Sequence, residues 1–313
     1  MHGKGIEDPG ALMKAVEASE ENATSAHDPT SVYAGRHAVL ATMHGKESVI
    51  APVMLEKLGL IVSIAPGIDT DTFGTFTGEI PRAGTIREAA IRKARLGMDA
   101  TGLQIGLASE GSYGPHPHFP FIPGGVEIMV LVDNLNNIVV SETLIEDAPV
   151  FGNVFASTDD ELASFLERVD FPHHALIVKS ADPPTPSRAI YKGLRDREEV
   201  SEAMVRCAAR SRDGRALVQT DMRAHMNPTR MSTLQRLAAR LADRLLQACP
   251  ACRMPGFGQT DVEVGLPCED CGAPSLLVRH HIFQCVACSY LEKRPRPDGR
   301  DYADPGQCPQ CNP

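Results

Sequence analysis

The sequence lacks long apolar runs. No stretch approaches the roughly 20 consecutive apolar residues that a membrane-spanning helix needs. The N-terminal residues lead into a polar, acidic segment instead of the apolar core of a signal peptide. We therefore predict a cytoplasmic protein without a membrane partner.

An excess of positive charge is also missing. The 313 residues include 31 basic and 40 acidic side chains, a formal net charge of −9. Proteins that coat nucleic acid carry a basic surface, so this balance excludes a general coating role and leaves only a local basic site open. The 42% apolar and 23% charged residues exclude a disordered or fibrous chain, and the length suits about two domains.

Four segments follow one another along the chain. Residues 1–34 are polar and are expected to form a mostly flexible leader. Strand and helix patterns alternate over residues 35–150 and again over 151–248, whereas residues 249–313 hold most of the cysteines. Alternating strands and helices are typical of layered α/β folds. The sequence therefore predicts α/β domains with a mixed sheet, followed by a small C-terminal double zinc ribbon.

Apolar periodicity locates the individual elements. Strands are expected at residues 37–42, 60–64, 105–108, 126–132, 137–142, 175–179 and 216–220. Helices are expected at residues 49–58, 84–97, 158–169, 197–209 and 232–248. The last of these has the clearest pattern, because its leucines form one stripe and its arginines form another face. That helix ends the 151–248 segment and leads directly into the cysteines.

Eight of the nine cysteines form four Cys-x-x-Cys pairs in the last 65 residues. In a chain without a secretion signal, such pairs favour metal thiolates over disulfides. A tetrahedral zinc ion takes four thiolates, so four pairs predict two sites, and closed shells make both sites structural. His280 and His281 are then not needed as ligands. The expected ligands are Cys249, Cys252, Cys268, Cys271, Cys285, Cys288, Cys308 and Cys311.

The loops between successive pairs hold 15, 13 and 19 residues. These spacings favour sequential pairing, which gives two tandem ribbons. Nested pairing, the first pair with the fourth and the second with the third, is the alternative. Cys207, the ninth cysteine, falls in a helix-like stretch and is expected to be a small buried residue.

Zinc ribbons often dock on nucleic acid or on another protein, so the sequence is compatible with an RNA partner or a protein partner. Residues 249–313 carry 6 basic and 8 acidic side chains, and eight thiolates against two zinc ions add about −4. Only Lys293-Arg294-Pro295-Arg296 is locally basic. This balance favours a solvated hairpin tip there over a phosphate contact.

Three segments near the N-terminus occur in a familiar order. Residues 41–46, Ala-Thr-Met-His-Gly-Lys, end the first expected strand; residues 85–94 begin a helix with Thr-Ile-Arg-Glu-Ala-Ala-Ile-Arg-Lys-Ala; and residues 107–112, Leu-Ala-Ser-Glu-Gly-Ser, follow the next strand. Over about residues 37–132 this order resembles the inosine and xanthosine triphosphate pyrophosphatases. The resemblance implies hydrolysis of a nucleoside triphosphate with Mg²⁺ or Mn²⁺.

The resemblance also assigns roles to individual residues. It implies that Lys46 and Lys93 bind phosphate, that Glu88 is a magnesium ligand, and that Glu110 acts near the attacking water. His44, in the same turn as Lys46, and Ser112, beside Glu110, complete the expected substrate contacts.

Each of these residues also has a purely structural interpretation. Thr85-x-x-Glu88 is a capping-box pattern, so Glu88 can close the start of its helix. Lys46 and Lys93 can be ordinary solvated lysines. His116 and His118 alternate with prolines, which fits either a metal clamp or exposed loop residues. Asp69 and Asp71 fit either a carboxylate pair or turn caps.

Residues 220–230 form a second polar segment, Thr-Asp-Met-Arg-Ala-His-Met-Asn-Pro-Thr-Arg. From 201 to 248 the chain holds nine arginines, no lysine and four acids, and arginine favours bidentate phosphate or carboxylate contacts. Asp221 and His225 are expected to supply a metal ligand or a general base, and Arg223 and Arg230 to hold a phosphate. A helix cap by Asn227 is the structural alternative.

Over nearly residues 37–313 the chain is similar to an uncharacterised bacterial family, marked by the 221–231 run and by a tail that ends Cys-Pro-x-Cys-Asn-Pro. That resemblance brings no known activity. The first hypothesis is a metal-dependent hydrolase of a phosphate-containing small molecule, with structural zinc. The alternative is a non-enzymatic module that binds RNA or a protein partner through its zinc ribbons.

Overall fold

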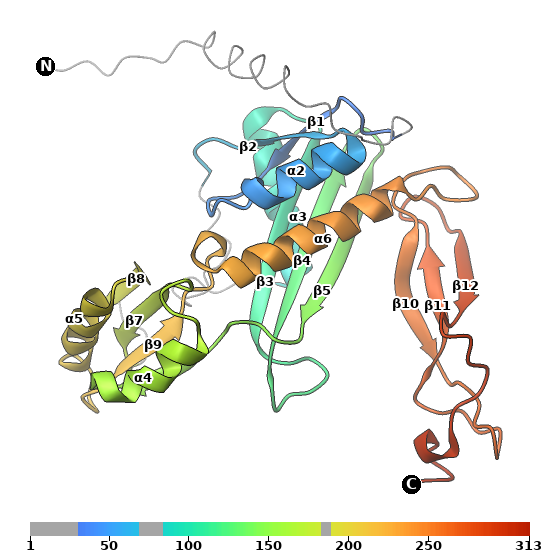
Figure 1. The fold of residues 1–313 in the computed structure, drawn as a ribbon. Coiled ribbons are helices and arrows are strands. Elements are labelled where there is room, and N and C mark those ends of the chain that lie inside the picture. Colours follow the sequence, from blue (N-terminus) through green and yellow to red (C-terminus); the bar gives the residue numbers. More distant parts are fainter. Residues whose placement is uncertain (1–30, 69–83, 183–188) are drawn as a thin grey trace, which may run out of the picture.

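The computed structural model describes residues 31–68, 84–182 and 189–313 (Figure 1). Most of the expected leader and the pair Asp69 and Asp71 lie outside these residues. The described chain forms three sheets with helices packed on the first two, which confirms the α/β prediction.

The first sheet has five strands in the order β2-β1-β3-β4-β5. Strand β1 runs parallel to both β2 and β3, whereas β4 runs antiparallel to both β3 and β5, so the sheet is mixed. The strands are β1 (His37–Leu40), β2 (Ile61–Ile64), β3 (Ile105–Pro115), β4 (Pro123–Asp133) and β5 (Ile138–Glu146).

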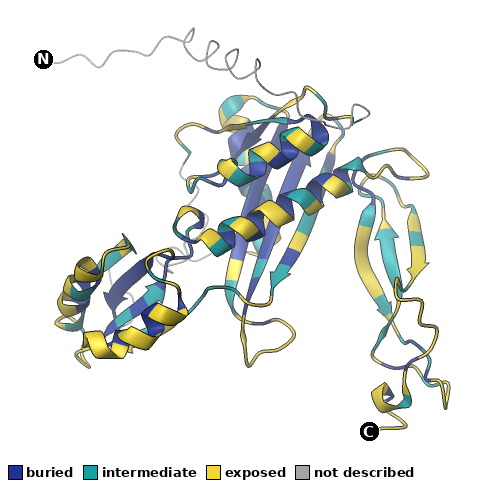
Figure 2. Ribbon diagram, viewed as in Figure 1, coloured by how far each residue is buried: buried dark blue, intermediate teal, exposed yellow. Residues whose placement is uncertain are grey.

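Three helices cover this sheet, α2 (Glu47–Leu58), α3 (Ile86–Thr101) and α6 (Pro228–Leu246). Successive side chains of a strand point to opposite faces. Accordingly, Ala38 and Leu40 of β1 join the core with α2 and α6, and Val39 joins the core with α3. Figure 1 shows α2 and α6 on the same face, and Figure 2 shows the strands between the helix layers as buried.

Helix α6 follows the second sheet in the chain but packs on the first sheet. We expected this helix to complete the second α/β segment. Its apolar stripe, Leu234, Leu237, Leu241 and Leu245, is instead fully buried in the core of the first sheet with α2. The chain therefore leaves the first sheet after β5, builds the second sheet and returns, because this stripe needs the apolar face that α2 leaves uncovered.

The second sheet has four antiparallel strands in the order β6-β9-β7-β8. Helices α4 (Asp159–Arg168) and α5 (Arg197–Ala208) pack on it, and Cys207 is buried in this core, as expected. The sequence predicted β7 (Leu176–Ser180) and β9 (Ala216–Thr220) but missed β6 (Asn153–Ala156) and β8 (Ile190–Leu194). Both missed strands are short, half-exposed edge strands, so their apolar pattern is weak.

The C-terminal sheet has three antiparallel strands, β10 (Gly258–Val264), β11 (Val278–Gln284) and β12 (Leu291–Pro295). Figure 2 shows that its strands are half-buried or exposed along most of their length. A sheet that buries so few side chains needs another source of stability, and bound metal is one source that small domains use. Two short 3-10 helices, η3 (Ala224–Met226) and η4 (Pro305–Gln307), complete the described elements.

Candidate functional site

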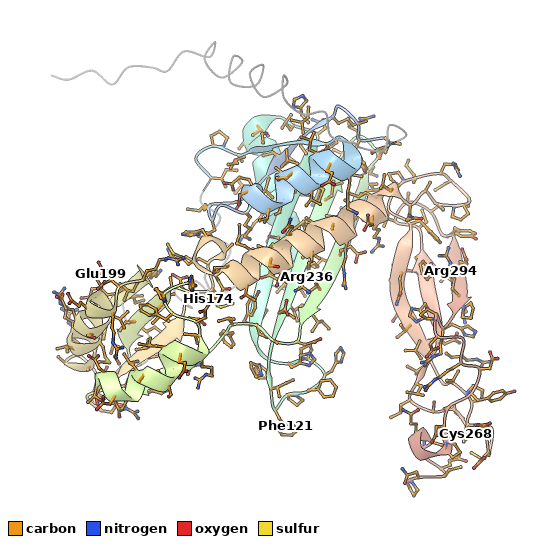
Figure 3. The ribbon with its side chains drawn as sticks, viewed as in Figure 1. Phe121, His174, Glu199, Arg236, Cys268 and Arg294 are labelled. Atoms are coloured by element: carbon orange, nitrogen blue, oxygen red, sulfur yellow. The ribbon has the colours of Figure 1, made fainter. Side chains whose placement is uncertain are left out.

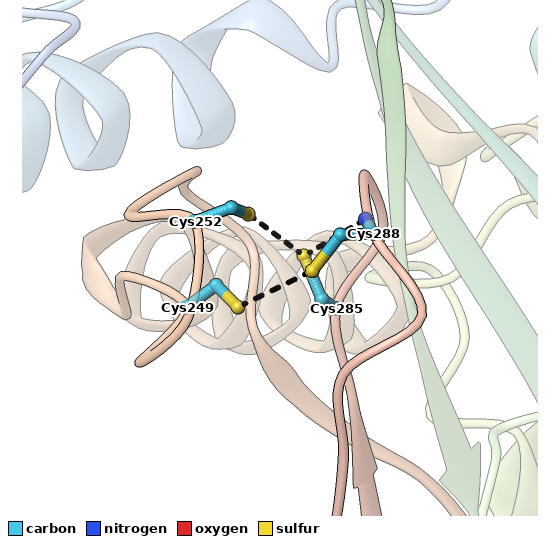
Figure 4. Close-up of side chains that lie close together, drawn as sticks. All are labelled: Cys249, Cys252, Cys285 and Cys288. Carbon is cyan, nitrogen blue, oxygen red and sulfur yellow. Dashed lines mark hydrogen bonds between the residues drawn. The ribbon is translucent and has the colours of Figure 1, made fainter.

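The eight paired cysteines form two clusters of four sulfur atoms. In the first cluster the Sγ atoms of Cys249 and Cys288 are 3.8 Å apart and those of Cys252 and Cys285 are 3.6 Å apart (Figure 4). A zinc ion with Zn–S bonds of about 2.3 Å sets its ligand sulfurs about 3.8 Å apart. The separations therefore fit tetrahedral zinc.

The second cluster repeats this geometry at the other end of the sheet. The Sγ atoms of Cys268 and Cys311 are 3.9 Å apart, and those of Cys271 and Cys308 are 3.7 Å apart. Within each cluster, all four sulfurs lie within 4.8 Å of one another. Both groups can bind zinc through four cysteines, as the sequence predicted. His280 and His281 belong to neither group, and their ring nitrogens contact Glu263 and Gln259 instead.

The pairing of the cysteines corrects the prediction. The first Cys-x-x-Cys pair meets the third and the second meets the fourth, so both sequential and nested pairing are wrong. The strand order explains this interleaving. Gly258 at the start of β10 lies opposite Gln284 at the end of β11, and His280 near the start of β11 lies opposite Pro295 at the end of β12. An antiparallel meander thus brings alternate connections to the same end of the sheet.

The protein environment prepares these sulfurs for a metal. Backbone N–H groups of Cys311 and Gln310 lower the pKa of Cys308 to about 7, whereas the thiols of Cys271 and Cys268 raise the pKa of Cys311 to about 12. The thiol of Cys308 therefore ionises easily, but ionisation of a second thiol beside this negative sulfur, such as that of Cys311, is unfavourable. A divalent cation removes that conflict, because it binds all four as thiolates.

A second candidate site lies where the order of the first sheet reverses. The connection through α2 places β2 on one side of β1, and the connection through α3 places β3 on the other side. The two helices cover opposite faces of the sheet. In open α/β sheets, ligands bind at such a switch point, outside the carboxyl ends of the strands.

Three predicted site residues meet at this switch point. Lys46, at the start of α2, donates to the carbonyl oxygen of Ser109 at 3.1 Å and to its Oγ at 3.0 Å. Lys93 of α3 forms an ion pair with Glu110 of β3. Lys46, Lys93 and Glu110 are only 8%, 7% and 5% exposed, so neither lysine is an ordinary solvated side chain.

A buried ion pair adjoins these residues. Arg230 of α6 lies 2.6 Å from Glu127 of β4, and the Tyr113 hydroxyl donates to the same carboxylate at 2.7 Å. Arg230 was predicted as a site residue, whereas Glu127 and Tyr113 were not. The signal for Glu127 was present, because it is an acid in the otherwise apolar strand expected at 126–132. We call Lys46, Lys93, Ser109, Glu110, Tyr113, Glu127 and Arg230 the switch-point cluster.

Burial and charge shift the acid–base properties of this cluster. Burial and the Arg230 guanidinium lower the pKa of Lys46 to about 8, against the opposing effect of Glu110 and Glu127. Burial raises the pKa of Glu127, but the ion pair with Arg230 outweighs burial and holds that pKa below its usual range. Burial and the Glu127 charge raise the pKa of Tyr113. The cluster therefore holds a lysine that can exchange its proton near neutral pH.

The loop at residues 221–230 contacts the turn that carries Lys46. The rings of His44 and His225 stack with centroids 5.3 Å apart. Gly45 also lies close to His225, because a Cβ added to Gly45 would be 3.6 Å from the Cβ of His225. Burial and Arg223 lower the pKa of His225. The two segments that the sequence singled out thus lie side by side.

Asp221 and Arg223 form a closed pair in this loop. Arg223 donates from Nε to Oδ1 at 3.0 Å and from Nη2 to Oδ2 at 2.6 Å, and Asp221 is fully buried. Asn227 caps α6 by accepting from the backbone N–H of Arg230, with Pro228 in the first turn, as the structural alternative had it. Because Asp221 accepts two hydrogen bonds from the Arg223 guanidinium, it orients that side chain.

Other predicted residues lie outside the switch-point cluster. Glu88 completes the capping box with Thr85, whose backbone N–H donates to Oε2 at 2.8 Å and lowers the pKa of Glu88. Ser112 lies two residues beyond Glu110 on β3 and is exposed. In the described part of the chain, groups of three or more potential metal ligands occur only at the cysteines.

The two histidines of the proline-rich loop have different surroundings. The Nδ1 atom of His116 accepts the backbone N–H groups of His118 and Phe119 at 3.1 and 3.0 Å, and its Nε2 atom lies 2.9 Å from Asp147. His116 therefore supports the loop between β3 and β4. Phe121, at the tip of this loop, is 98% exposed (Figure 3).

Fold and sites together define an α/β protein with two four-cysteine clusters that can bind zinc. The chain matches a family described as a domain of unknown function (DUF6671) over residues 93–313, more than half of its length, and it belongs to that family. The match spans Glu110, residues 221–230 and all eight paired cysteines, and it begins after β1 and Lys46.

The family description names no activity. A search of curated proteins finds no match. The resemblance to the inosine and xanthosine triphosphate pyrophosphatases gains no support from these comparisons and stays a prediction. Among the described residues, the helices are too short or too polar to span a membrane.

Proposed function

We propose that the protein hydrolyses a phosphate-containing small molecule, such as a nucleoside triphosphate, just beyond the carboxyl end of β1 and beside the middle of β3. The observation that carries this proposal is the convergence of Lys46, Lys93 and Glu110 at the topological switch point. Buried ammonium and guanidinium groups beside a carboxylate suit phosphate transfer to water, because the cations neutralise developing charge and the carboxylate activates the nucleophile.

Four residues of the cluster have a direct role in this proposal. Lys46, Lys93 and Arg230 contact the phosphate oxygens. Lys93 pairs with Glu110 when no substrate is bound, and its move to a phosphate leaves the Glu110 carboxylate to accept a proton from water. Glu110, together with the substrate phosphates, would hold a Mg²⁺ or Mn²⁺ ion, which would supply Lewis-acid stabilisation. Glu88 is left out of this site, since its carboxylate is occupied by the helix cap.

In this proposal the stacked pair His44 and His225 borders the site, because His44 lies two residues before Lys46. In this proposal Arg223, held by Asp221, meets a further anionic group of the substrate. Asp221 is then a positioning residue, and His225 exchanges protons at the rim.

Phosphate release tests the proposal. The full-length, zinc-loaded protein is incubated with a panel of canonical and deaminated nucleoside triphosphates and Mg²⁺ or Mn²⁺, with pyrophosphatase added before colorimetric detection. We expect turnover that Glu110→Gln reduces by about a hundredfold or more, the usual contribution of a general base. Glu56→Gln is the matched control, because Glu56 is exposed on α2.

The unfolding temperature and zinc content of Glu110→Gln are compared with those of wild type, and equal values show that any loss of turnover is not a loss of folding. Equal turnover by Glu110→Gln and wild type would contradict the role of Glu110. No turnover of any nucleotide by folded protein would favour the alternative, a binding module in which the switch-point cluster only connects helices to the sheet.

A further inference from the structure

A groove of about 890 Å³ lies between the first sheet and the zinc-binding sheet. Strand β5 lines one side and β10 lines the other, and each is the end strand of its sheet. Helix α6 contributes Arg240 and Arg244 to the lining. The groove therefore runs between two strand edges that meet no further strand within the described residues.

Arg244 holds the two sides of the groove in place. Its Nη1 atom donates to the Ser141 carbonyl of β5 at 3.0 Å and contacts Glu142 at 2.9 Å, while its Nε atom donates to the Gly256 carbonyl, just before β10, at 3.1 Å. Phe257 also donates its backbone N–H to Gln247 at 3.1 Å. These contacts preform the groove, so a ligand meets a site that is already ordered.

The outer edge of β5 can accept another strand. The Ser141 carbonyl points away from β4, because it accepts from Arg244. In an antiparallel pair, alternate residues of a strand direct their backbone N–H and C=O groups to the partner strand and the others direct them away, so the N–H and C=O of Thr143 also face outward. Thr143 is exposed and lines the groove. Exposed edges of this kind bind extended peptides through backbone hydrogen bonds.

Two arginines give this groove a preference for negative charge. The described lining of the groove has three acids, of which Glu142 pairs with Arg244, Asp243 pairs with Lys57, and Asp261 accepts the backbone N–H of Val262 at 2.8 Å. The four arginines of this described lining, Arg87, Arg240, Arg244 and Arg294, outnumber these acids by one. Arg87 contacts only the Ser141 hydroxyl, at 3.2 Å, and exposed Arg240 lines the groove without an ion pair, as judged over residues 31–68, 84–182 and 189–313.

The aromatic side chain of Phe283, which lines the groove, is poorly placed to stack on a nucleic-acid base. Arg294 of the zinc-binding sheet (Figure 3) lies over the Phe283 ring at 4.1 Å and pairs with Glu292. One face of Phe283 is thereby covered. In addition, each zinc ion with four thiolates carries a charge of about −2, which opposes a polyphosphate backbone more than a few carboxylates.

We propose that this groove binds an extended acidic peptide of a protein partner, which adds as a strand to β5 and places carboxylates against Arg87 and Arg240. This interaction is separate from the switch-point cluster and does not depend on hydrolysis.

Peptide selection tests the proposal. A phage-displayed library of short random peptides is panned on the full-length, zinc-loaded protein, and selected peptides are made with a fluorescein label for anisotropy. We expect acidic sequences whose affinity falls by about tenfold or more in Arg240→Glu and in Thr143→Pro, since each change removes a contact to the peptide. Pro is tolerated on an edge strand but lacks the N–H donor.

The matched controls are Arg279→Glu, an exposed arginine of β11 outside the groove lining, and Thr143→Val, which keeps the backbone N–H. Both should bind like wild type. Selected peptides that bind Arg240→Glu and Thr143→Pro as tightly as wild type would overturn the proposal, as would a library that yields no binder. A labelled uridine-rich RNA that binds wild type and loses affinity in Arg240→Glu would also overturn it, in favour of RNA.

Discussion

Lys46 is a lysine held away from water beside another cation. Its ammonium group donates to Ser109 inside the protein, and Arg230 adds unfavourable charge that Glu110 and Glu127 offset only in part. Burial favours the neutral form of a lysine. Retaining such a residue costs stability, which is a common feature of binding sites that are completed by an oppositely charged ligand.

The low pKa of Lys46 predicts a specific dependence of stability on pH. The folded protein releases the Lys46 proton near pH 8, whereas the unfolded chain keeps it until about pH 10.5. Unfolding therefore takes up a proton between these values, and the Lys46 contribution to the free energy of unfolding rises with pH across that window, by up to about 3 kcal/mol.

Urea unfolding of wild type and Lys46→Met at several pH values measures this effect. The advantage of Lys46→Met over wild type should be largest below pH 8 and shrink as the pH approaches 10.5. Lys57→Met, on the surface of the same helix, is the control and should show no such trend. A constant difference between wild type and Lys46→Met would mean that Lys46 keeps an ordinary pKa.

The sequence predicts the bounds of some secondary-structure elements well but does not predict which elements pack together. Strand β9 begins and ends where its apolar pattern does, because local periodicity is enough to locate a buried strand. The partner of α6 was not predictable in this way, since an amphipathic stripe indicates that a helix is half-buried without specifying the sheet that covers it. For Glu88 the local pattern Thr85-x-x-Glu88 was enough to predict the capping box that the structure has.

Residues of the switch-point cluster were predicted unevenly for a similar reason. Lys46, Lys93, Glu110 and Arg230 stand out beside glycines, caps or other polar residues. Glu127 comes from a strand whose neighbours look like ordinary core, and Tyr113 follows the exposed Ser112 with no sign of a partner in the sequence. Only the antiparallel register of β3 and β4 brings both to Arg230. Contacts that depend on strand register across distant segments are not readable from spacing alone.

Cysteine pairing is decided by whole strands, and this gives a second prediction. Cys249→Ser with Cys285→Ser removes two ligands of one cluster, whereas Cys249→Ser with Cys268→Ser removes one ligand from each. We expect the first double variant to lose about half of the bound zinc and the second to lose most of it from both sites. Zinc released by acid and measured with a chromogenic chelator gives the stoichiometry.

Sequential pairing would reverse these two results, so the experiment separates the arrangements. Cys207→Ser is the control, because Cys207 is buried in the second sheet away from both clusters, and its zinc content should match wild type. Retention of about half of the zinc by the Cys249→Ser and Cys268→Ser double variant would contradict the interleaved pairing.

At the scale of the whole molecule, the three sheets rely on different sources of stability. The first two have large apolar cores between sheet and helices. The zinc-binding sheet has a few buried side chains, among them Phe257, Leu266 and Ala303, and two cysteine clusters at its opposite ends. The C-terminal part is therefore expected to fold with its metal, as small metal-binding domains do.

Metal removal should act on that part alone. After chelation under reducing conditions, amide hydrogen exchange is expected to speed up in β10, β11 and β12 and to stay slow in β1, β3 and β4, whose hydrogen bonds are buried in the first sheet. Added zinc should restore protection. Unchanged exchange in β10 to β12 without metal would show that the sheet is stable by itself.

The switch-point cluster is proposed to bind the phosphate groups of a small molecule. Titration calorimetry of the full-length protein with inorganic triphosphate at about pH 8.5, in buffers of different ionisation enthalpy, measures this binding. We predict binding that takes up protons, because the anion favours the protonated form of Lys46, and that is weakened by about tenfold or more in Lys46→Met. Equal affinity in wild type and Lys46→Met, or no binding to folded wild type, would contradict the claim.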